Sequence, residues 1–212
     1  MIKLACPIPN KITLACSGGS DSMVALDFLL RGRKEIRVAH FNHGTDHSQE
    51  AEDFLKSFCR YRELELIIGN INREKSSGES PEEYWRNQRL NWLHDLNVPV
   101  VTAHHLDDAV EWWIFSSLNG MGKLIPLRNR NIMRPFLLAP KTEIVDWASR
   151  KEVSFLNDPS NKELDYARNR IRHNIMPEVL KINPGIHTLV RKKLENNIKI
   201  AQARKIGDLP AC

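Results

Sequence analysis

The chain has 212 residues, of which 42% are hydrophobic and 27% are charged, and its formal net charge at pH 7 is +5. These values are typical of a globular protein, and the length favours one medium α/β domain with an appendage. No apolar run approaches the ~20 residues that a membrane helix needs, so we expect no membrane partner. The four cysteines lie far apart without a C-x-x-C pair, which argues against a zinc ribbon, a redox dithiol or a disulfide scaffold. Residues 1–10 do not resemble a signal peptide, so a cytoplasmic protein is expected.

A glycine-rich turn lies between an apolar strand predicted over 11–16 and a helix predicted over 23–30. It consists of Ser17, Gly18, Gly19, Ser20, Asp21 and Ser22. The two glycines let the backbone turn tightly, and the free N–H groups of the following helical turn attract an anion. The serine hydroxyls add hydrogen-bond donors, whereas a carboxylate fits an anion site only if a cation such as Mg²⁺ bridges it to the anion. An ordinary strand–helix turn with a Ser or Asp cap is the alternative.

Further strands and helices alternate up to residue 118. The strands are predicted over Ile36–His43, Leu64–Ile68 and Val98–Ala103, and the helices over Gln49–Tyr61, from Pro81 after a Ser80 cap, and over Ala109–Leu118. This alternation predicts a doubly wound parallel sheet with helices on both faces. Ligands bind beyond the carboxyl ends of such strands. The glycine-rich turn, His40–His43 and His104–Asp108 all follow strands, so they are expected to meet in one crevice.

The remainder of the chain contains shorter elements. Ile132–Phe136 is predicted to be extended, although Pro135 argues against a central strand. Helices are predicted over Lys141–Lys151, from Tyr166 to Asn174 and over about 184–205, with a turn over 157–161.

The positive charge is concentrated at the end of the chain. Residues 181–212 hold seven Lys or Arg and two acids, whereas the first 180 residues hold 24 of each sign. We therefore expect a main domain over 1–180 and a basic helical extension over 181–212. The extension suits a polyanion such as RNA, and a solvated helix face is the alternative.

These motifs together resemble a known family. Ser17–Ser22 matches the SGGxDS loop of the N-type ATP pyrophosphatase, or PP-loop, superfamily. Further matches to the tRNA(Ile)-lysidine synthetases are His40–His43, Pro81–Arg86, Thr102–Glu111, Arg134-Pro135, 157–161 and Arg168–Arg172. The resemblance implies a Rossmann-like fold of the adenine nucleotide alpha hydrolase type, with residues 1–180 as the catalytic domain.

The resemblance also implies a ligase reaction in two steps, with ATP, Mg²⁺, free L-lysine and tRNA(Ile) with a CAU anticodon. ATP first adenylates the C2 oxygen of the wobble cytidine and releases pyrophosphate. The lysine amine then displaces AMP to give lysidine. The loop lacks the lysine of a Walker A motif, so it need not serve γ-phosphate transfer.

Each site residue takes its role from this match. Ser17–Ser22 would bind the pyrophosphate part of ATP, with Mg²⁺ on Asp21, and Ala39, His40 and Phe41 would lie against the adenine, mostly through backbone. Arg86 would reach the α-phosphate region, although a surface arginine is the alternative.

The segment 104–111, which contains histidines and carboxylates, is expected to bind the second substrate, lysine. Asp108 and Glu111 can share one helix face, and an acidic pocket is what a substrate amine requires. The family match assigns lysine binding to both. Capping of the helix N-terminus by Asp107 and Asp108 is the alternative for one of them. His104 is expected to orient a phosphate or a carboxylate, and His105 is expected to be structural.

RNA binding is expected from basic residues late in the chain. The candidates are Arg168, Arg172, Arg191, Lys192 and Lys193. Typical family members have further domains after this point, so a short form is expected, and a homodimer is expected as well. Trp112 and Asn119 depart from the family pattern, which puts an RNA or phosphate contact in question.

Other functions fit parts of the sequence. A tRNA-thiolating enzyme would need paired cysteines near the site, and an amidotransferase-type synthetase would need an ammonia-supplying domain. His104–Asp108 could instead belong to a metal-dependent phosphoesterase. A non-catalytic nucleotide- or RNA-binding domain is the remaining alternative, against which the intact Asp21, Asp108 and Glu111 argue.

Overall fold

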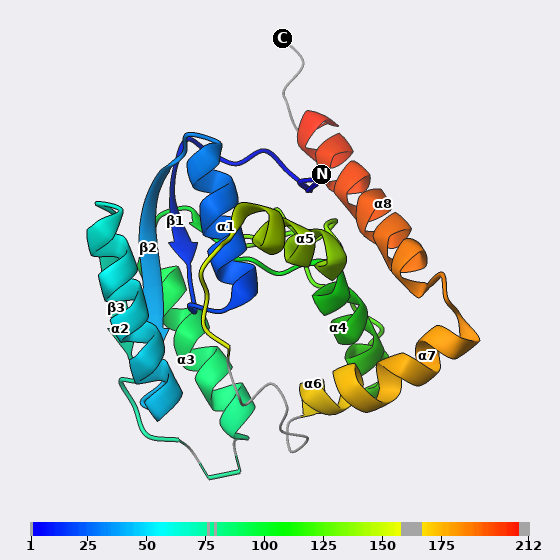
Figure 1. Cartoon of the computed structure of the whole chain (residues 1–212). Coiled ribbons are helices and arrows are strands. Elements are labelled where there is room, and N and C mark those ends of the chain that lie inside the picture. Colours follow the sequence, from blue (N-terminus) through cyan, green and yellow to red (C-terminus); the bar gives the residue numbers. More distant parts are fainter. Residues whose placement is uncertain (1, 76, 79, 158–166, 208–212) are drawn as a thin grey trace.

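The computed structural model describes residues 2–75, 77–78, 80–157 and 167–207 (Figure 1). Within them, six strands form one sheet in the order β3-β2-β1-β4-β6-β5. They are β1 (Lys11–Ala15), β2 (Glu35–Asn42), β3 (Leu66–Asn70), β4 (Val100–Val101), β5 (Arg128–Asn129) and β6 (Ile132–Met133). Neighbouring strands pair in parallel, except that β5 runs antiparallel to β6. The predicted α/β fold with a parallel sheet is confirmed.

The helices follow the predicted order. They are α1 (Ser20–Arg31), α2 (Asp46–Tyr61), α3 (Pro81–Asp95), α4 (Leu106–Leu118), α5 (Lys141–Lys151), α6 (Ala167–Arg170), α7 (Met176–Ile182) and α8 (Ile186–Gly207), with a π-helical turn over Ile171–Ile175. α5 has the predicted bounds, and α3 begins at Pro81 after a Ser80 cap. α1, α2 and α4 each begin about one turn earlier than predicted. The predicted starts exclude the polar residues of the first turn, and these residues are helical in the structure. In α2, for example, the side chain of Thr45 accepts a hydrogen bond from the backbone N–H of Ser48.

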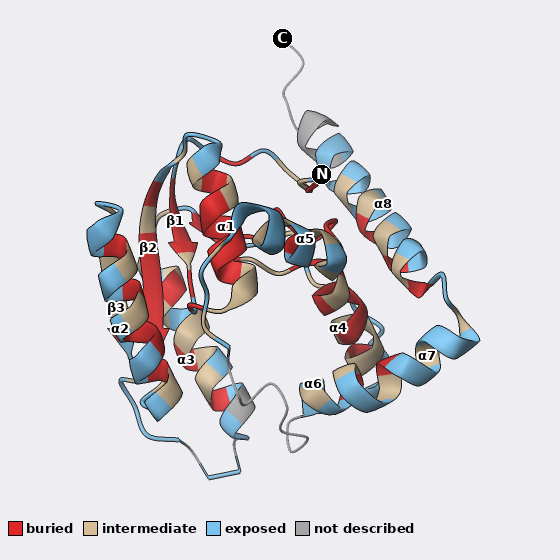
Figure 2. Ribbon diagram, in the orientation of Figure 1, coloured by how far each residue is buried: buried red, intermediate tan, exposed pale blue. Residues whose placement is uncertain are grey.

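The two faces of the sheet carry alternate residues of each strand. Leu14, Val38 and Val101 belong to a core cluster with residues of α1, α2 and α5. Ala39 and Val100 point to the opposite face, where residues of α3 cover them. Helices therefore cover both faces, as predicted, and the buried residues in Figure 2 lie mainly where these layers meet.

A separate apolar cluster joins α4 to the end of the described chain. Leu106 and Val110 of α4 pack with Ile171 of the π-helical turn and with Val190 and Leu194 of α8. Figure 1 shows α8 beside α4, away from the sheet. The predicted basic extension thus packs on the main domain through an apolar side. The boundary predicted at residue 180 stays a prediction.

The short strand β6 corrects one expectation. The proline within residues 132–136 predicts that no central strand forms there, yet β6 lies between β4 and β5 inside the sheet. The strand ends at Met133, before Pro135, so the ladder needs no N–H from the proline. The carbonyl of Pro135 instead accepts a hydrogen bond from the N–H of Ala5 at 2.7 Å.

Other boundaries differ slightly from the predictions. β3 and β4 are shorter or shifted, over Leu66–Asn70 and Val100–Val101. The turn predicted over 157–161 lies outside the described residues after Asn157. None of the described helices is both long and apolar enough to span a membrane.

Candidate active site

The glycine-rich turn is held by its own serines. The Ser22 hydroxyl donates to the Gly19 carbonyl at 2.9 Å and accepts from the Ser17 N–H at 3.2 Å. Gly18 has a φ of 82°, a left-handed value that glycine adopts without strain. α1 begins directly after Gly19, and no side chain caps its N-terminus. Its first-turn N–H groups therefore remain available to an anion, as the sequence predicts.

Asp21 is the point where distant segments meet. Its carboxylate accepts a hydrogen bond from the Lys141 ammonium of α5, which also donates to the Ser20 hydroxyl at 3.3 Å. On the other side, Nε2 of His105 lies 3.5 Å from Oδ2 of Asp21. Burial opposes ionisation of Asp21, but His105 and Lys141 outweigh it and hold its pKa below the usual value. Sequence reasoning gave neither His105 nor Lys141 a role at the site, and no local pattern marks Lys141.

His105 also connects Asp21 to the carboxylates of α4. Its Nε2 lies 3.6 Å from Oδ2 of Asp108, and its backbone N–H donates to the same oxygen at 2.9 Å. The Asp108 N–H in turn donates to Nδ1 of His105 at 3.4 Å, which completes a capping box. Burial disfavours the charged ring, but Asp108 and Asp21 raise the pKa of His105 above its ordinary value.

The two aspartates at the start of α4 have different surroundings. Asp108 takes part in the capping box and faces the crevice. Asp107 accepts from the backbone N–H of Lys141 at 2.7 Å and lies 3.3 Å from Nε2 of His187. Capping thus uses both. The helical spacing allows either aspartate to share a face with Glu111, and the structure pairs Asp108 and Glu111 with the same two arginines.

Two arginines meet this buried acidic pair. Glu111 is 4% exposed and Asp108 is 8% exposed. Nε of Arg172 lies 2.7 Å from Oε1 of Glu111 and its Nη2 lies 3.0 Å from Oε2, a bidentate fork. Arg168 bridges both acids, at 2.6 Å from Asp108 and 3.3 Å from Glu111. Burial opposes ionisation of Asp108, but His105 and Arg168 depress its pKa strongly. The structure therefore joins residues that the sequence assigned separately to lysine and to RNA.

A further group of cationic side chains includes Arg89 and Arg134. Arg134 is 5% exposed, its Nη1 donates to the Pro126 carbonyl at 2.9 Å, and its Nε has no partner among the described residues. Burial and the charges of Arg86 and Arg89 lower the pKa of Arg134 to about 10. Burial, Arg168 and Arg86 likewise lower the pKa of Arg89 to about 10. Arg86 and Arg89 thus both act electrostatically on Arg134, and Arg168, which pairs with Asp108, acts on Arg89.

His104 and Arg86, both predicted site residues, border this cluster. Nδ1 of His104 lies 2.8 Å from the Thr102 hydroxyl. Burial lowers the pKa of His104 to about 3. The charges of Arg134 and Arg168 also lower it and Asp108 opposes them, so the ring is neutral at pH 7. Arg86 is exposed, and its guanidinium lies 5.1 Å from the ring centroid of Trp112. Trp112, which departs from the family pattern, thus makes a cation–π contact with Arg86.

The predicted adenine contacts lie mostly in the interior. Ala39 is 2% exposed, His40 3% and Phe41 6%. Nδ1 of His40 lies 3.0 Å from the Cys16 carbonyl, and the Phe41 ring packs against Trp92 with centroids 5.6 Å apart. Any contact with a base must therefore use backbone or a ring edge, which agrees with the backbone contact expected from the sequence.

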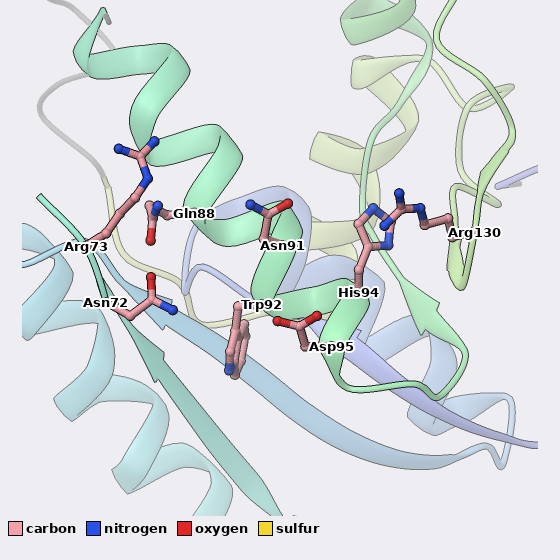
Figure 3. A pocket seen from close by; sticks show the side chains of 8 residues that line it. All are labelled: Asn72, Arg73, Gln88, Asn91, Trp92, His94, Asp95 and Arg130. Carbon is pink, nitrogen blue, oxygen red and sulfur yellow. The ribbon is translucent and has the colours of Figure 1, made fainter. Parts of the chain in front are cut away.

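Two features lie apart from this crevice. A cavity of about 350 Å³ adjoins α3 and the turn before β6, and Figure 3 shows the polar side chains that surround it. It is lined by Asn72, Arg73, Gln88, Asn91, Trp92, His94, Asp95 and Arg130, none of which is a predicted site residue. On α8, Lys192 and Lys193 are exposed and Arg191 is partly buried. The Lys193 ammonium lies 5.9 Å from the ring centroid of Trp113 on α4.

Comparison with known proteins agrees with this geometry. The family model described as the PP-loop domain matches residues 4–179. The tRNA(Ile)-lysidine synthase of Aster yellows witches'-broom phytoplasma is 31% identical over 190 residues, which cover 83% of this chain and 43% of that protein. The tRNA(Ile)-lysidine synthase of Buchnera aphidicola is 33% identical over 180 residues, covering 77% and 41%. The chain belongs to the PP-loop domain family.

A solved structure gives independent support for the fold. The NH3-dependent NAD synthetase of Campylobacter jejuni superposes with a TM-score of 0.51 at 16% identity, covering 97% of this chain and 90% of that chain. At this identity the match supports the fold alone. The chain spans less than half the length of the two curated relatives described above.

We predict that His43, just after β2, makes folding sensitive to mild acid. Burial, with the charges of Arg89 and His40, lowers the His43 pKa to about 4. Below pH 6.5 the unfolded chain binds a proton that the folded chain excludes, so the free energy of unfolding falls as pH drops from 6.5 towards 4, by up to about 1.4 kcal/mol per pH unit.

Urea unfolding of wild type and His43→Gln at pH 6.5, 5.5 and 4.5 measures this contribution. The variant should lose less stability than wild type over the interval. Asn196→Gln, an exposed and non-titrating change on α8, is the control and should follow wild type. Equal pH slopes for wild type and His43→Gln would contradict the predicted contribution.

Proposed function

We propose that this chain ligates lysine to C2 of the wobble cytidine of tRNA(Ile) with a CAU anticodon, through an adenylated tRNA intermediate. ATP is converted to AMP and pyrophosphate. The observation that carries the proposal is the position of His105, whose ring lies 3.5 Å from Asp21 in the anion-binding turn and 3.6 Å from Asp108 in the buried acidic pair. The likeness to proteins named tRNA(Ile)-lysidine synthase supports the choice of substrate.

The turn and α1 supply the ATP half of the proposed site. First-turn N–H groups and the Ser20 hydroxyl would hold phosphate oxygens, and Arg86 would approach the α-phosphate from α3. The described residues contain no group of three or more His, Cys, Asp or Glu that could hold a metal ion by themselves. One carboxylate with substrate phosphates is nevertheless an ordinary Mg²⁺ environment, so Asp21 fits. Bound Mg²⁺ would neutralise charge that develops on the leaving pyrophosphate.

The α4 carboxylates and their arginines supply the lysine half. Free lysine is a zwitterion at its α-carbon and carries a second ammonium on its side chain. A mixed cluster of two acids and two arginines can pair with both signs, with Asp108 and Glu111 receiving an ammonium and Arg172 receiving the carboxylate. The substrate would then exchange charge partners with the cluster, so that no buried charge is left alone.

The alternatives receive less support from the described residues. A phosphoesterase would need the multi-residue metal site that these residues do not form. A thiolating enzyme would need reactive cysteines, but Cys16 and Cys59 are buried, and burial raises the Cys59 pKa to about 11. A homodimer and a cytoplasmic location remain predictions from the sequence.

The direct test of the reaction is incubation with ATP, Mg²⁺, radiolabelled lysine and unmodified tRNA carrying a CAU anticodon. Label should enter the tRNA with wild-type protein, and Asp21→Ala should abolish it because the turn loses its carboxylate. Asp53→Ala, on the exposed side of α2, is the matched control and should retain activity. Full activity of Asp21→Ala would refute the metal role of Asp21.

The lysine half is tested separately by Glu111→Gln. The loss of one carboxylate charge should raise the KM for lysine by about tenfold, the effect of losing one charge-assisted hydrogen bond. Glu178→Gln, on the exposed face of α7, is the control. An unchanged KM for lysine in a folded Glu111→Gln protein would remove Glu111 from the lysine site.

We also propose that α8 binds tRNA phosphates. Because Val190 and Leu194 of α8 are core residues, charges should be removed without deleting the helix. Changing Arg191, Lys192 and Lys193 to Gln should weaken tRNA binding and reduce its salt slope by about 0.7–0.9 for each phosphate that the helix no longer neutralises. An unchanged slope would contradict the proposal. The control variant neutralises three exposed residues elsewhere: Arg33, Arg60 and Arg62.

A further inference from the structure

The N-terminus of α5 is held by two contacts, one to α4 and one to the glycine-rich turn. The backbone N–H of Lys141 donates to Asp107 of α4 at 2.7 Å, which gives α5 a cap that its own N-cap residue, Pro140, does not supply. The side chain of Lys141 reaches the other way, to the hydroxyl of Ser20 and the carboxylate of Asp21. Both the backbone and the side chain of Lys141 are therefore held in place, the first by α4 and the second by the glycine-rich turn.

This contact places a lysine where the loop itself has none. The segment Ser17–Ser22 contains serines, glycines and one aspartate, so it offers N–H and O–H donors but no positive side chain. Many phosphate-binding loops carry a lysine that reaches the terminal phosphates. Here the ammonium comes from a residue 120 positions later in the chain.

We propose that Lys141 binds the pyrophosphate portion of ATP, and that Asp21 holds its ammonium in place when no nucleotide is bound. The inference rests on the proposed function and extends its ATP site. The Lys141 ammonium lies against Ser20, the first residue of α1, and the N–H groups of that turn face the expected anion. A phosphate held there is a neighbour of the ammonium.

The charges at Asp21 explain why the lysine would change partners. An unneutralised carboxylate beside the loop repels a phosphate, and the Lys141 ammonium is a cation that the structure places against it. If Asp21 held Mg²⁺ in the ATP complex, its carboxylate would no longer need the Lys141 ammonium, which would then be free to pair with a phosphate oxygen. Lysine suits this exchange because its charge is compact and its four-carbon stem is flexible.

The experiment measures binding of inorganic pyrophosphate to the full chain by calorimetry, with and without Mg²⁺. Lys141→Met should weaken pyrophosphate binding by about tenfold or more, because the variant cannot form the charge-assisted hydrogen bond to phosphate. Lys141→Arg should stay within about threefold of wild type, since it keeps the charge. Binding of adenosine, which has no phosphate, should be unchanged in both. Lys151→Met, at the other end of α5, is the matched control.

A double-mutant comparison separates phosphate binding from a structural ion pair. In metal-free buffer, Asp21→Asn should bind pyrophosphate more tightly than wild type, because it removes repulsion and frees Lys141. In the Asp21→Asn background, Lys141→Met should lower pyrophosphate affinity at least as much as it does in the wild-type background. If Lys141 served only to neutralise Asp21, Lys141→Met would have little effect once Asp21 is replaced by Asn. If Lys141→Met does not fold, the Asp21→Asn variant alone still tests the proposal. A pyrophosphate affinity no higher than that of wild type in metal-free buffer would overturn it.

The outcomes distinguish this inference from the proposed function. Wild-type pyrophosphate affinity in Lys141→Met, with wild type still converting ATP to AMP and pyrophosphate in the presence of tRNA, would overturn the inference alone. An equal loss of adenosine binding would also overturn it, because it would show a general structural effect. Wild-type protein that neither binds nor releases pyrophosphate would overturn both.

Discussion

The contact of His105 with two carboxylates is the interaction on which the rest of the site depends. The ring lies 3.5 Å from Asp21 and 3.6 Å from Asp108, so it joins the glycine-rich turn after β1 to the first turn of α4. A buried carboxylate such as Asp108 is costly unless it is paired and hydrogen-bonded. His105 meets this need at Asp108 and also contacts the partly exposed Asp21, and its raised pKa follows from these two neighbours. Two loops that carry different parts of the proposed chemistry are thereby held at one place.

The remaining charges of the site are balanced by segments from the second half of the chain. Lys141 of α5 pairs with Asp21, and Arg168 and Arg172 pair with Asp108 and Glu111. Each of these side chains is positively charged, and so is the ligand that would bind the same carboxylate in the proposed reaction, namely a metal ion or a substrate ammonium. The proposals share one physical idea, cation exchange: a ligand would replace a protein cation at a carboxylate, and the freed protein cation would pair with an anionic group.

The sequence predicts the parallel sheet and the convergence of three strand ends, because strand–helix alternation and glycine chemistry are local signals. It cannot predict how the charges pair. Arg168 and Asp108 are 60 positions apart, and Lys141 and Asp21 are 120 apart, so no spacing rule connects them. The π-helical turn that presents Arg172 also has no sequence signature. The extended segment predicted at 132–136 is present as β6, but the expectation that Pro135 argues against an inner strand is wrong, because the two-residue strand ends before the proline.

The most direct test of the account is whether its two halves act in order at one site. Wild-type protein incubated with α-³²P-labelled ATP, Mg²⁺ and unmodified CAU tRNA, without lysine, should place label from the α-phosphate on the tRNA, and later addition of lysine should release labelled AMP. Glu111→Gln should form the labelled tRNA but discharge it slowly. Failure of wild type to label the tRNA, or discharge by Glu111→Gln at the wild-type rate over a range of low lysine concentrations, would contradict the account.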